Sequence, residues 1–406
     1  MNFFRRSLIL QVLYLAMILL LCRVSPTAWA GYGGPDQTFG VSNGRVVIAG
    51  SYGYNHMSVT VLQPDGRILI GGICRTSVSS APDQTCVARL LSNGQLDTSF
   101  GLGGFYLGGT SATNCVGGGA LSVASDGLIY VGGATTRTVN GQAIPHFCVT
   151  RLDASGAVDS TYGLGGVAVS PPINVWFITN APMTLHLLES GAVVLTAQCM
   201  PLVSSGANGS VFCATGLHAD GSVETDFGSN GVTLLSMPTP YSVLSASTIA
   251  NGGIYLTGWC NTKPTPGSEK MCVAKLNHMG VPDLTWGGAG WFLASVSGAA
   301  STQGNELVEM GDGSSIITGA CVTDVRRGCL LRLGPDGTLD TSFASSGVVF
   351  DDARFGISGF GSVMTVEDGA MLVLSGRCGL SVNVNNLCVW RVSSAGQVDS
   401  GFGDQG

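Results

Sequence analysis

The sequence predicts an all-β fold built from repeated copies of one small unit, and three observations lead to this class. Only 11% of the 406 residues are charged and 61 are glycine, which suits short strands joined by tight turns better than long solvated helices. A short motif recurs along the chain, consisting of an acidic residue, two variable residues, an aromatic residue and a small residue. Cysteines recur in step with this motif.

The motif occurs seven times, at intervals of 57 to 65 residues. Its copies read DQTFG, DTSFG, DSTYG, ETDFG, DLTWG, DTSFA and DSGFG. Their acidic and aromatic residues are Asp36 and Phe39, Asp97 and Phe100, Asp159 and Tyr162, Glu224 and Phe227, Asp283 and Trp286, Asp340 and Phe343, and Asp399 and Phe402. Seven copies enclose six intervals, so one supersecondary unit is repeated six times.

Each unit contains four predicted strands, numbered in chain order. The first follows the motif, as in VVIAG at Val46–Gly50, and the fourth is a run such as CVARL at Cys86–Leu90. The second and third form a hairpin, as at Ser58–Gly72, around an Asp-Gly or Ser-Gly turn in which glycine supplies the positive φ. These runs are too short for helices. Six copies of a four-stranded antiparallel unit predict a six-bladed β-propeller.

The order of strands along the chain also predicts how the ring closes. The chain begins with a first strand, Val46–Gly50, and ends after a fourth strand, Cys388–Val392. An open ring would expose two unpaired sheet edges. We therefore expect the N-terminal strand to pair beside the C-terminal fourth strand, so that residues 31–406 form a single closed propeller domain.

Residues 1–30 are predicted to be a secretory signal peptide. Two arginines precede the apolar run Leu8–Cys22, and Ala28 and Ala30 form a small-residue cleavage site. The alternative is an uncleaved anchor, although the run is shorter than the ~20 residues that span a bilayer. Cleavage leaves a mature chain without a transmembrane span, which we place in the periplasm, outside the cell or on its surface.

The charge of the mature chain excludes one class of partner. Removal of Arg5, Arg6 and Arg23 leaves 15 basic residues against 25 acidic ones, and no basic cluster offsets the difference. Such a surface repels phosphate backbones, so we expect no nucleic-acid partner.

Twelve cysteines remain after cleavage, and ten of them lie in pairs, one at the end of a third strand and one at the start of the fourth. Adjacent antiparallel strands bring these points within disulfide reach, and export favours disulfides over zinc, the alternative for paired cysteines. These pairs are Cys74–Cys86, Cys199–Cys213, Cys260–Cys272, Cys321–Cys329 and Cys378–Cys388. In the second unit Thr135 occupies the third-strand position, and Cys115–Cys148 is the predicted substitute.

We interpret the motif as a structural connection between the fourth strand of one unit and the first strand of the next. Its acid accepts backbone N–H groups, its aromatic residue packs between neighbouring blades, and its glycine lets the chain reverse. Glu224 and Ala344 depart from the pattern, which predicts looser turns there. The alternative is a repeated ion site, but each copy holds one reliable acid, and Ca²⁺ takes six or more oxygen ligands.

The fourth-strand motif, the Asp-Gly hairpin and the closing (D/E)xx(F/Y/W)G together resemble the delta-60 repeat family. The resemblance covers essentially all of Asp36 to Gly406. It implies a secreted bacterial protein with a propeller-like fold, and it implies no assigned reaction.

The two rims of the predicted disc differ in sequence. The hairpin turns and the connections from fourth strand to motif form a uniform rim. The loops between third and fourth strands form a varied rim, rich in Ser, Thr, Asn and Gln, which reads RTSVSSAPDQT at 75–85 and NTKPTPGSEKM at 261–271. Varied loops on a rigid scaffold are where binding usually occurs, so we expect a polar ligand such as a glycan or a peptide on this rim. The alternative is that these are only solvated loops.

Signals of catalysis are few. No nucleophile elbow, P-loop, HExxH or paired-acid box occurs. His56 and His186 lie at or in second strands, which line the channel if that strand is innermost, but the matching positions in other units form no ligand ring. We therefore assign no catalytic, metal or cofactor-binding residue.

The combined observations favour a binding or scaffolding module over an enzyme, with a polysaccharide, a peptide or a cell-envelope protein as its partner. One alternative is an extracellular propeller enzyme, such as a lactonase or sugar dehydrogenase, that uses a channel site. The other is a structural component of the cell surface.

Overall fold

A computed structural model describes most of the chain between residues 37 and 403. The described ranges are 37–40, 44–48, 52–76, 83–108, 115–139, 141–173, 175–177, 183–201, 209–235, 237, 239, 241–250, 252–261, 267–344, 346–351, 357–366, 369–378 and 386–403. The predicted signal peptide and Asp36 lie outside these residues. Among the described residues, none belongs to a helix with the length and apolar character needed to cross a membrane.

The described strands form six antiparallel sheets, which we call blades one to six in chain order. Blade one contains β1 (Tyr52–Leu62), β2 (Ile68–Thr76), β3 (Gln84–Leu90) and β4 (Phe105–Leu107). Blade two contains β5 (Val116–Val123), β6 (Ile129–Val139), β7 (Gln142–Leu152) and β8 (Val167–Val169). Blade three contains β9 (Val175–Phe177), β10 (Met183–Leu187), β11 (Val193–Pro201), β12 (Val211–Leu217) and β13 (Val232–Leu235).

The remaining blades follow the same order. Blade four contains β14 (Tyr241–Ala250), β15 (Gly253–Asn261), β16 (Lys270–Asn277) and β17 (Trp291–Leu293). Blade five contains β18 (Ser301–Glu309), β19 (Ser315–Val322), β20 (Arg326–Leu333) and β21 (Val348–Phe350). Blade six contains β22 (Ile357–Val366), β23 (Met371–Cys378) and β24 (Asn386–Ser393).

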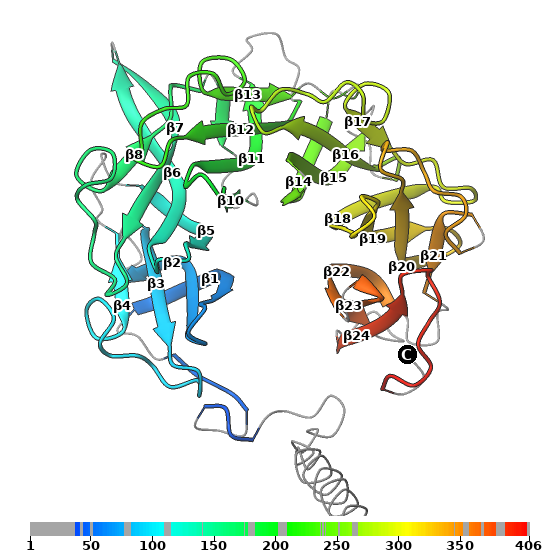
Figure 1. The fold of residues 1–406 in the computed structure, drawn as a ribbon, viewed down its shortest axis with the longest axis horizontal. Helices are drawn as coiled ribbons and strands as arrows, with labels where there is room; N and C mark the ends of the chain where they lie inside the picture. The colour runs from blue at the N-terminus through cyan, green and yellow to red at the C-terminus, as the bar shows by residue number, and fades with distance from the viewer. Residues whose placement is uncertain are drawn as a thin grey trace, which may run out of the picture.

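The six blades are arranged around a central opening (Figure 1). The first strand of each hairpin, such as β1 or β14, lies next to the opening, and the short strand after each motif lies outermost. That short strand pairs with the strand before the motif in the same blade: Phe105 of β4, for example, pairs with Ala88 of β3. The motif therefore links two strands of one blade and also lies at the junction with the next blade.

Each junction is built from the motif aromatic and the residue that follows it. Phe100, Tyr162, Phe227, Trp286 and Phe343 are all at most 2% exposed. The next residue donates its N–H to a turn carbonyl of the following blade: Gly101 to Ser155 at 2.7 Å, Gly163 to Asp220 at 2.8 Å, Gly228 to Met279 at 2.7 Å, Gly287 to Asp336 at 2.7 Å, and Ala344 to Ala395 at 3.4 Å. This regular contact explains why the motif recurs once in each unit.

A glycine in the receiving turn makes room for the aromatic ring. A Cβ on Gly337 would lie 2.5 Å from the ring of Trp286, and one on Gly280 would lie 2.4 Å from the ring of Phe227. Both glycines also have φ near +70° to +80°, where other residues are strained. The turn glycines are therefore required by packing between blades as well as by the turn itself.

Six disulfides join the twelve cysteines of the predicted mature chain. They connect Cys74 to Cys86, Cys115 to Cys148, Cys199 to Cys213, Cys260 to Cys272, Cys321 to Cys329, and Cys378 to Cys388. Their Cα atoms are 5.4–6.0 Å apart, and they lie at the strand ends opposite the hairpin turns. Disulfides in this number are typical of a protein that is exported to an oxidising compartment.

Two expectations about the sheets differ from the structure. Blade three has a fifth strand, because β9 pairs with the end of β11. Blade six has three described strands, and no described strand pairs with the outer edge of β24. Val46, Val47 and Ile48 belong to no strand, and the last two residues of the predicted first strand lie outside the described residues. The ring is therefore not closed by strand pairing in the described part of the chain.

The expectation of looser turns at Glu224 and Ala344 is wrong for the backbone hydrogen bond that closes each turn. Phe227 donates its N–H to the carbonyl oxygen of Glu224 at 3.0 Å, and Phe343 donates to Asp340 at 3.1 Å, like the other motifs. The missing glycine instead affects the backbone conformation, since Ala344 has φ of 52°. The junction contact of Ala344 with Ala395, at 3.4 Å, is also the longest of the five.

Candidate functional site

The varied rim is braced at the bases of its loops. In blade one Arg75 Nε donates to Asp83 Oδ1 at 2.8 Å, across residues 77–82, which lie outside the described residues. In blade four Ser268 Oγ donates to Asn261 Oδ1 at 2.8 Å. A disulfide lies beside each of these contacts. The described ends of the loops are thus fixed to the sheet by covalent and polar contacts.

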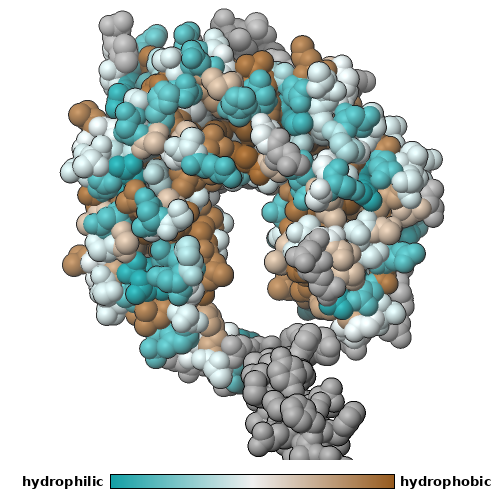
Figure 2. Space-filling view, in the orientation of Figure 1, coloured by the Kyte–Doolittle hydropathy of each residue, from teal (hydrophilic) through white to brown (hydrophobic). Residues whose placement is uncertain are grey.

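The central opening is bordered by the innermost strands, and apolar side chains are visible on both of its flanks (Figure 2). His186 on β10 faces blade four, where its Nε2 lies 2.7 Å from Ser247 Oγ. Thr196 Oγ1 also lies 2.7 Å from Ser247 Oγ. Burial lowers the pKa of His186 to about 4, so this histidine is neutral at pH 7 and links two blades by a hydrogen bond.

A carboxylate makes a comparable link between blades five and six. Glu306 on β18 accepts the N–H of Val363 at Oε2, at 2.8 Å. Burial raises the pKa of Glu306, while hydrogen bonds from Val363 and Ser362 oppose the shift. Asn305 donates from Nδ2 to the carbonyl oxygen of Phe360. These polar groups near the opening satisfy one another across blade junctions.

The histidines are not brought together. His56 lies exposed on β1, and His146 is buried with Nδ1 2.8 Å from the carbonyl oxygen of Ser170. His218 Nδ1 lies 2.8 Å from Glu224 Oε2, and His278 is exposed. Within the described ranges no group of three or more His, Cys, Asp or Glu side chains is placed to hold a metal ion.

The motif acids mostly pair with a cation on the preceding strand, a feature that the sequence interpretation missed. The pairs are Arg89 with Asp97 at 2.8 Å, Arg151 with Asp159 at 2.8 Å, Lys275 with Asp283 at 3.2 Å, Arg332 with Asp340 at 3.4 Å, and Arg391 with Asp399. In each case the cation stands eight residues before the acid. That constant spacing is the signal in the sequence from which the pairing could have been found.

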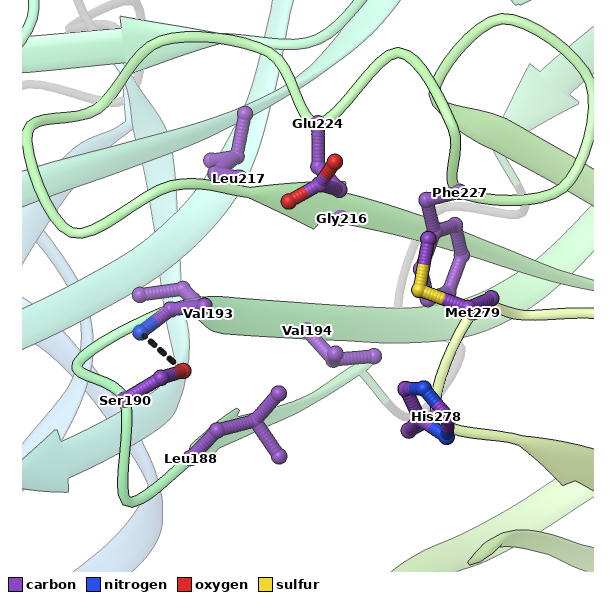
Figure 3. Close-up of a pocket in the computed structure, with 11 residues that line it drawn as sticks. Leu188, Ser190, Val193, Val194, Gly216, Leu217, Glu224, Phe227, His278 and Met279 are labelled. Atoms are coloured by element: carbon purple, nitrogen blue, oxygen red, sulfur yellow. Dashed lines mark hydrogen bonds between the residues drawn. The ribbon is translucent and has the colours of Figure 1, made fainter.

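Blade three breaks this pattern and contains a pocket beside its motif acid. Gly216 occupies the position of the cation, and the acid is Glu224 rather than aspartate. The pocket has a volume of about 130 Å³. It is lined by Leu188, Ser190, Ala192, Val193, Val194, Gly216, Leu217, Glu224, Phe227, His278 and Met279 (Figure 3). His278 and Met279 belong to blade four, so the pocket lies at a junction on the uniform rim.

Comparison with known proteins supports the fold. Residues 63–100, 124–162 and 312–343 match a family model described as a domain of unknown function (DUF5122) β-propeller. Each matched segment runs from a hairpin turn to a motif aromatic. A search of curated proteins finds no match.

Several solved structures are similar in shape at low sequence identity. An α-L-arabinofuranosidase from Fusarium graminearum, in complex with an iminosugar inhibitor, is 10% identical with a TM-score of 0.43 and covers 82% of this chain and 91% of its own. A GH43 endo-arabinanase from Bacillus licheniformis is 10% identical with a TM-score of 0.34, covering 83% and 94%. A sialidase from Trypanosoma rangeli, in complex with sialic acid, is 11% identical with a TM-score of 0.36, covering 84% and 54%.

Proposed function

We propose that the protein is an exported propeller module that binds a polar ligand, a glycan or a peptide, on its varied rim. The observation that carries this proposal is the position of the six disulfides, which all lie at the bases of the varied loops and not at the hairpin turns. Fixing both ends of a loop reduces the entropy lost when the loop binds a ligand. The periplasm or the cell exterior is the proposed compartment, with residues 1–30 as the export signal.

The composition of the loops determines the proposed ligand class. The segments 75–85 and 261–271 are rich in Ser, Thr, Asn and Gln, whose side chains both donate and accept hydrogen bonds. Apolar side chains are few there, so an apolar ligand would find little surface to bury. A glycan or an extended peptide presents the complementary set of hydroxyl, amide and carbonyl groups.

Loop replacement tests this proposal directly. In one variant, residues 77–82 and 262–266 are replaced by Gly and Ser, which leaves every cysteine and strand intact. Retention on glycan and peptide arrays is compared with that of the parent protein, and we expect it to be lost. The matched control replaces Ser125 and Asp126, two exposed residues in a hairpin turn of the uniform rim, and should bind like the parent.

The other outcomes separate the competing functions. Unchanged retention after loop replacement would contradict binding on this rim. Turnover of an array glycan would identify an enzyme instead of a binding module. Absence of binding and turnover, together with tight association with cell envelopes, would identify a structural component.

We also propose that Val46–Ile48 completes blade six and closes the ring as a single domain. The first motif is already docked on blade one, since Gly40 donates its N–H to Asn93 at 2.7 Å in the same way as Gly101 does to Ser155. Along the chain, Val46–Ile48 follows this motif as β4 follows the second motif. Among the described strands, none lies on the outer edge of β24, and Val389 on it is 47% exposed.

The register of this pairing follows from blade one. A Cβ on Gly101 would lie 2.2 Å from the carbonyl oxygen of Phe105, and a Cβ on Gly40 would lie 2.3 Å from that of Arg45. Arg45 is therefore the equivalent of Phe105, which pairs with Ala88, two residues after the disulfide cysteine of β3. By the same count Arg45 pairs with Trp390, and Val46 pairs with Val389.

An engineered disulfide tests this register. The double variant Val46→Cys, Val389→Cys should form a seventh disulfide within one chain, detectable in peptides digested without reduction. Val47→Cys with Val389→Cys is the control, because successive residues on a strand point to opposite faces. A cross-linked dimer would show that a second copy supplies the strand. In addition, deletion of residues 31–50 should lower the melting temperature sharply, and a variant that melts like the parent would contradict the seam.

A further inference from the structure

The cation that stands eight residues before the motif acid does more than pair with that acid. It also connects neighbouring blades. Arg151 Nη1 donates to the carbonyl oxygen of Ala219 in blade three at 2.9 Å, and Arg89 makes the same contact with Ala154 in blade two. Arg332 reaches Ser394 in blade six at 3.4 Å. A guanidinium at this position therefore contacts an acid on its own blade and a turn carbonyl on the next.

The guanidinium also lies over the motif aromatic. The centre of the Arg89 guanidinium is 4.5 Å from the centroid of the Phe100 ring, and that of Arg151 is 4.6 Å from the Tyr162 ring. A cation at this distance from a ring face is attracted by the ring quadrupole. An acid, an aromatic face and a carbonyl oxygen thus form one repeated guanidinium site.

Blade three keeps the surroundings of this site but lacks the cation. Glu224 supplies the acid, Phe227 supplies the ring, and His278 in blade four occupies the turn position equivalent to Ala154 and Ala219. All three line the pocket, together with Gly216, which stands in place of the cation (Figure 3). The pocket is therefore at the place where other blades hold a guanidinium.

The chain cannot easily supply this cation at residue 216 itself. A Cβ on Gly216 would lie 2.7 Å from Cγ and 2.9 Å from Cβ of Phe227. Any side chain there requires the whole phenyl group to move, because the close atoms are at its root. A cation that enters the pocket from outside does not meet this restriction.

His218 makes a contact with the acid of this motif. Its Nδ1 lies 2.8 Å from Glu224 Oε2, but its side chain is 47% exposed, and it lies outside the pocket lining. The second carboxylate oxygen of Glu224 has no hydrogen bond to another described residue. His218 would therefore compete with a bound cation for one oxygen of Glu224, but it does not fill the pocket.

We propose that this pocket binds the guanidinium group of an arginine side chain presented by a peptide or protein partner. The planar guanidinium matches a carboxylate and stacks on an aromatic ring, whereas an ammonium ion does neither as well. The apolar wall formed by Leu188, Val194 and Met279 suits the methylene groups of the arginine side chain. This site is on the rim opposite the varied loops and does not depend on binding there.

The test uses small capped amino acids as probes. Binding of N-acetyl-arginine amide to the full mature protein is followed by NMR, from the amide signals of Gly216 and Met279, at constant ionic strength. We expect saturable binding in the millimolar range, which is typical of a ligand with a single anchoring group. The neutral isostere N-acetyl-citrulline amide should bind at least about tenfold more weakly, and N-acetyl-lysine amide should be intermediate.

Three variants assign the binding to this pocket. Glu224→Gln should weaken the arginine probe by about tenfold, since it removes the charge and keeps the shape. His218→Ala should strengthen it severalfold, because it releases the oxygen that the histidine occupies, and a merely structural role for Glu224 would not produce this gain. Glu189→Gln removes one nearby charge on the same rim and should leave the affinity unchanged.

Each other outcome contradicts the proposal. It fails if the arginine probe does not bind, if citrulline binds equally well, or if Glu224→Gln and Glu189→Gln behave alike. It also fails if a capped peptide with one arginine among glycines does not bind while the single amino acid does, since the site would then accept only free small cations.

Discussion

The five junctions between successive blades and the seam between blades six and one are built differently. At a regular junction the motif aromatic is at most 2% exposed, and the next residue donates its N–H to the following blade. At the end of the chain Phe402 is only half-buried, and a Cβ on Gly403 would meet no atom within 4 Å. At the opposite end of β24, Leu387 is 80% exposed.

This difference shows which contacts depend on a neighbouring blade. The turn of the seventh motif forms without one, since Phe402 donates its N–H to Asp399 at 3.0 Å, as in the other motifs. The Arg391–Asp399 pair and the contact of Arg391 with the Phe402 ring also form within blade six. The motif is thus a local structure that is completed by burial against the next blade.

The largest expected effect comes from truncating the motif aromatic at a regular junction, and we compare it with truncating the aromatic of the seventh motif. Phe343→Ala should lower the free energy of unfolding by about 3–5 kcal/mol, the usual cost of removing a buried phenylalanine. Phe402→Ala should cost about 1 kcal/mol or less, because the ring loses little buried area. Denaturant unfolding with the disulfides intact measures both values. Equal costs would mean that Phe402 is buried in solution against a surface other than the receiving turn of blade one, because Gly40 of the first motif already contacts that turn at Asn93.

The acid–cation pairs give the next largest contrast. Asp97 and Arg89 are 6% and 4% exposed, while Asp399 and Arg391 are both 24% exposed. Asp97→Asn leaves a buried guanidinium without its countercharge and should cost about 3 kcal/mol at pH 7. Asp399→Asn should cost clearly less than Asp97→Asn, since water screens the more accessible pair.

The pH dependence of the Asp97 variant provides an independent check. Burial opposes ionisation, but hydrogen bonds from Ser99 and Arg89 outweigh it and lower the pKa of Asp97. Because the pKa of Asp97 is lower in the folded state, its ionised form stabilises the folded protein above the unfolded pKa of 3.8. This stabilisation is lost as the pH falls from 3.8 through the pKa of the folded state. The difference between parent and Asp97→Asn should therefore shrink below about pH 4. A constant difference down to pH 3 would point to lost packing.

Much of this architecture follows from the spacing of residues in the sequence. The interval between motifs predicted the repeated hairpins, because a strand pattern bounded by Asp-Gly or Ser-Gly turns has few alternatives. The fifth strand β9 was not predicted, since its pairing with β11 depends on an irregular connection in blade three. The pocket was also missed, although its signal was present. Gly216 interrupts a column of arginine and lysine, but its meaning depends on contacts between blades that a single repeat does not contain.

The smallest expected effect concerns the one motif in which alanine replaces the junction glycine. Ala344 has φ of 52°, a left-handed conformation that costs a residue with a Cβ about 1 kcal/mol. Ala344→Gly should stabilise the protein by roughly 0.5–1 kcal/mol, after allowing for the greater freedom of glycine in the unfolded chain. Thermal unfolding measures this change. Asn230→Gly is the control, because Asn230 also has a positive φ of 54° but asparagine tolerates it, so its effect should be near zero. If Ala344→Gly has no effect, the weak contact between Ala344 and Ala395 is not caused by the alanine, and the junction between blades five and six is then looser for another reason.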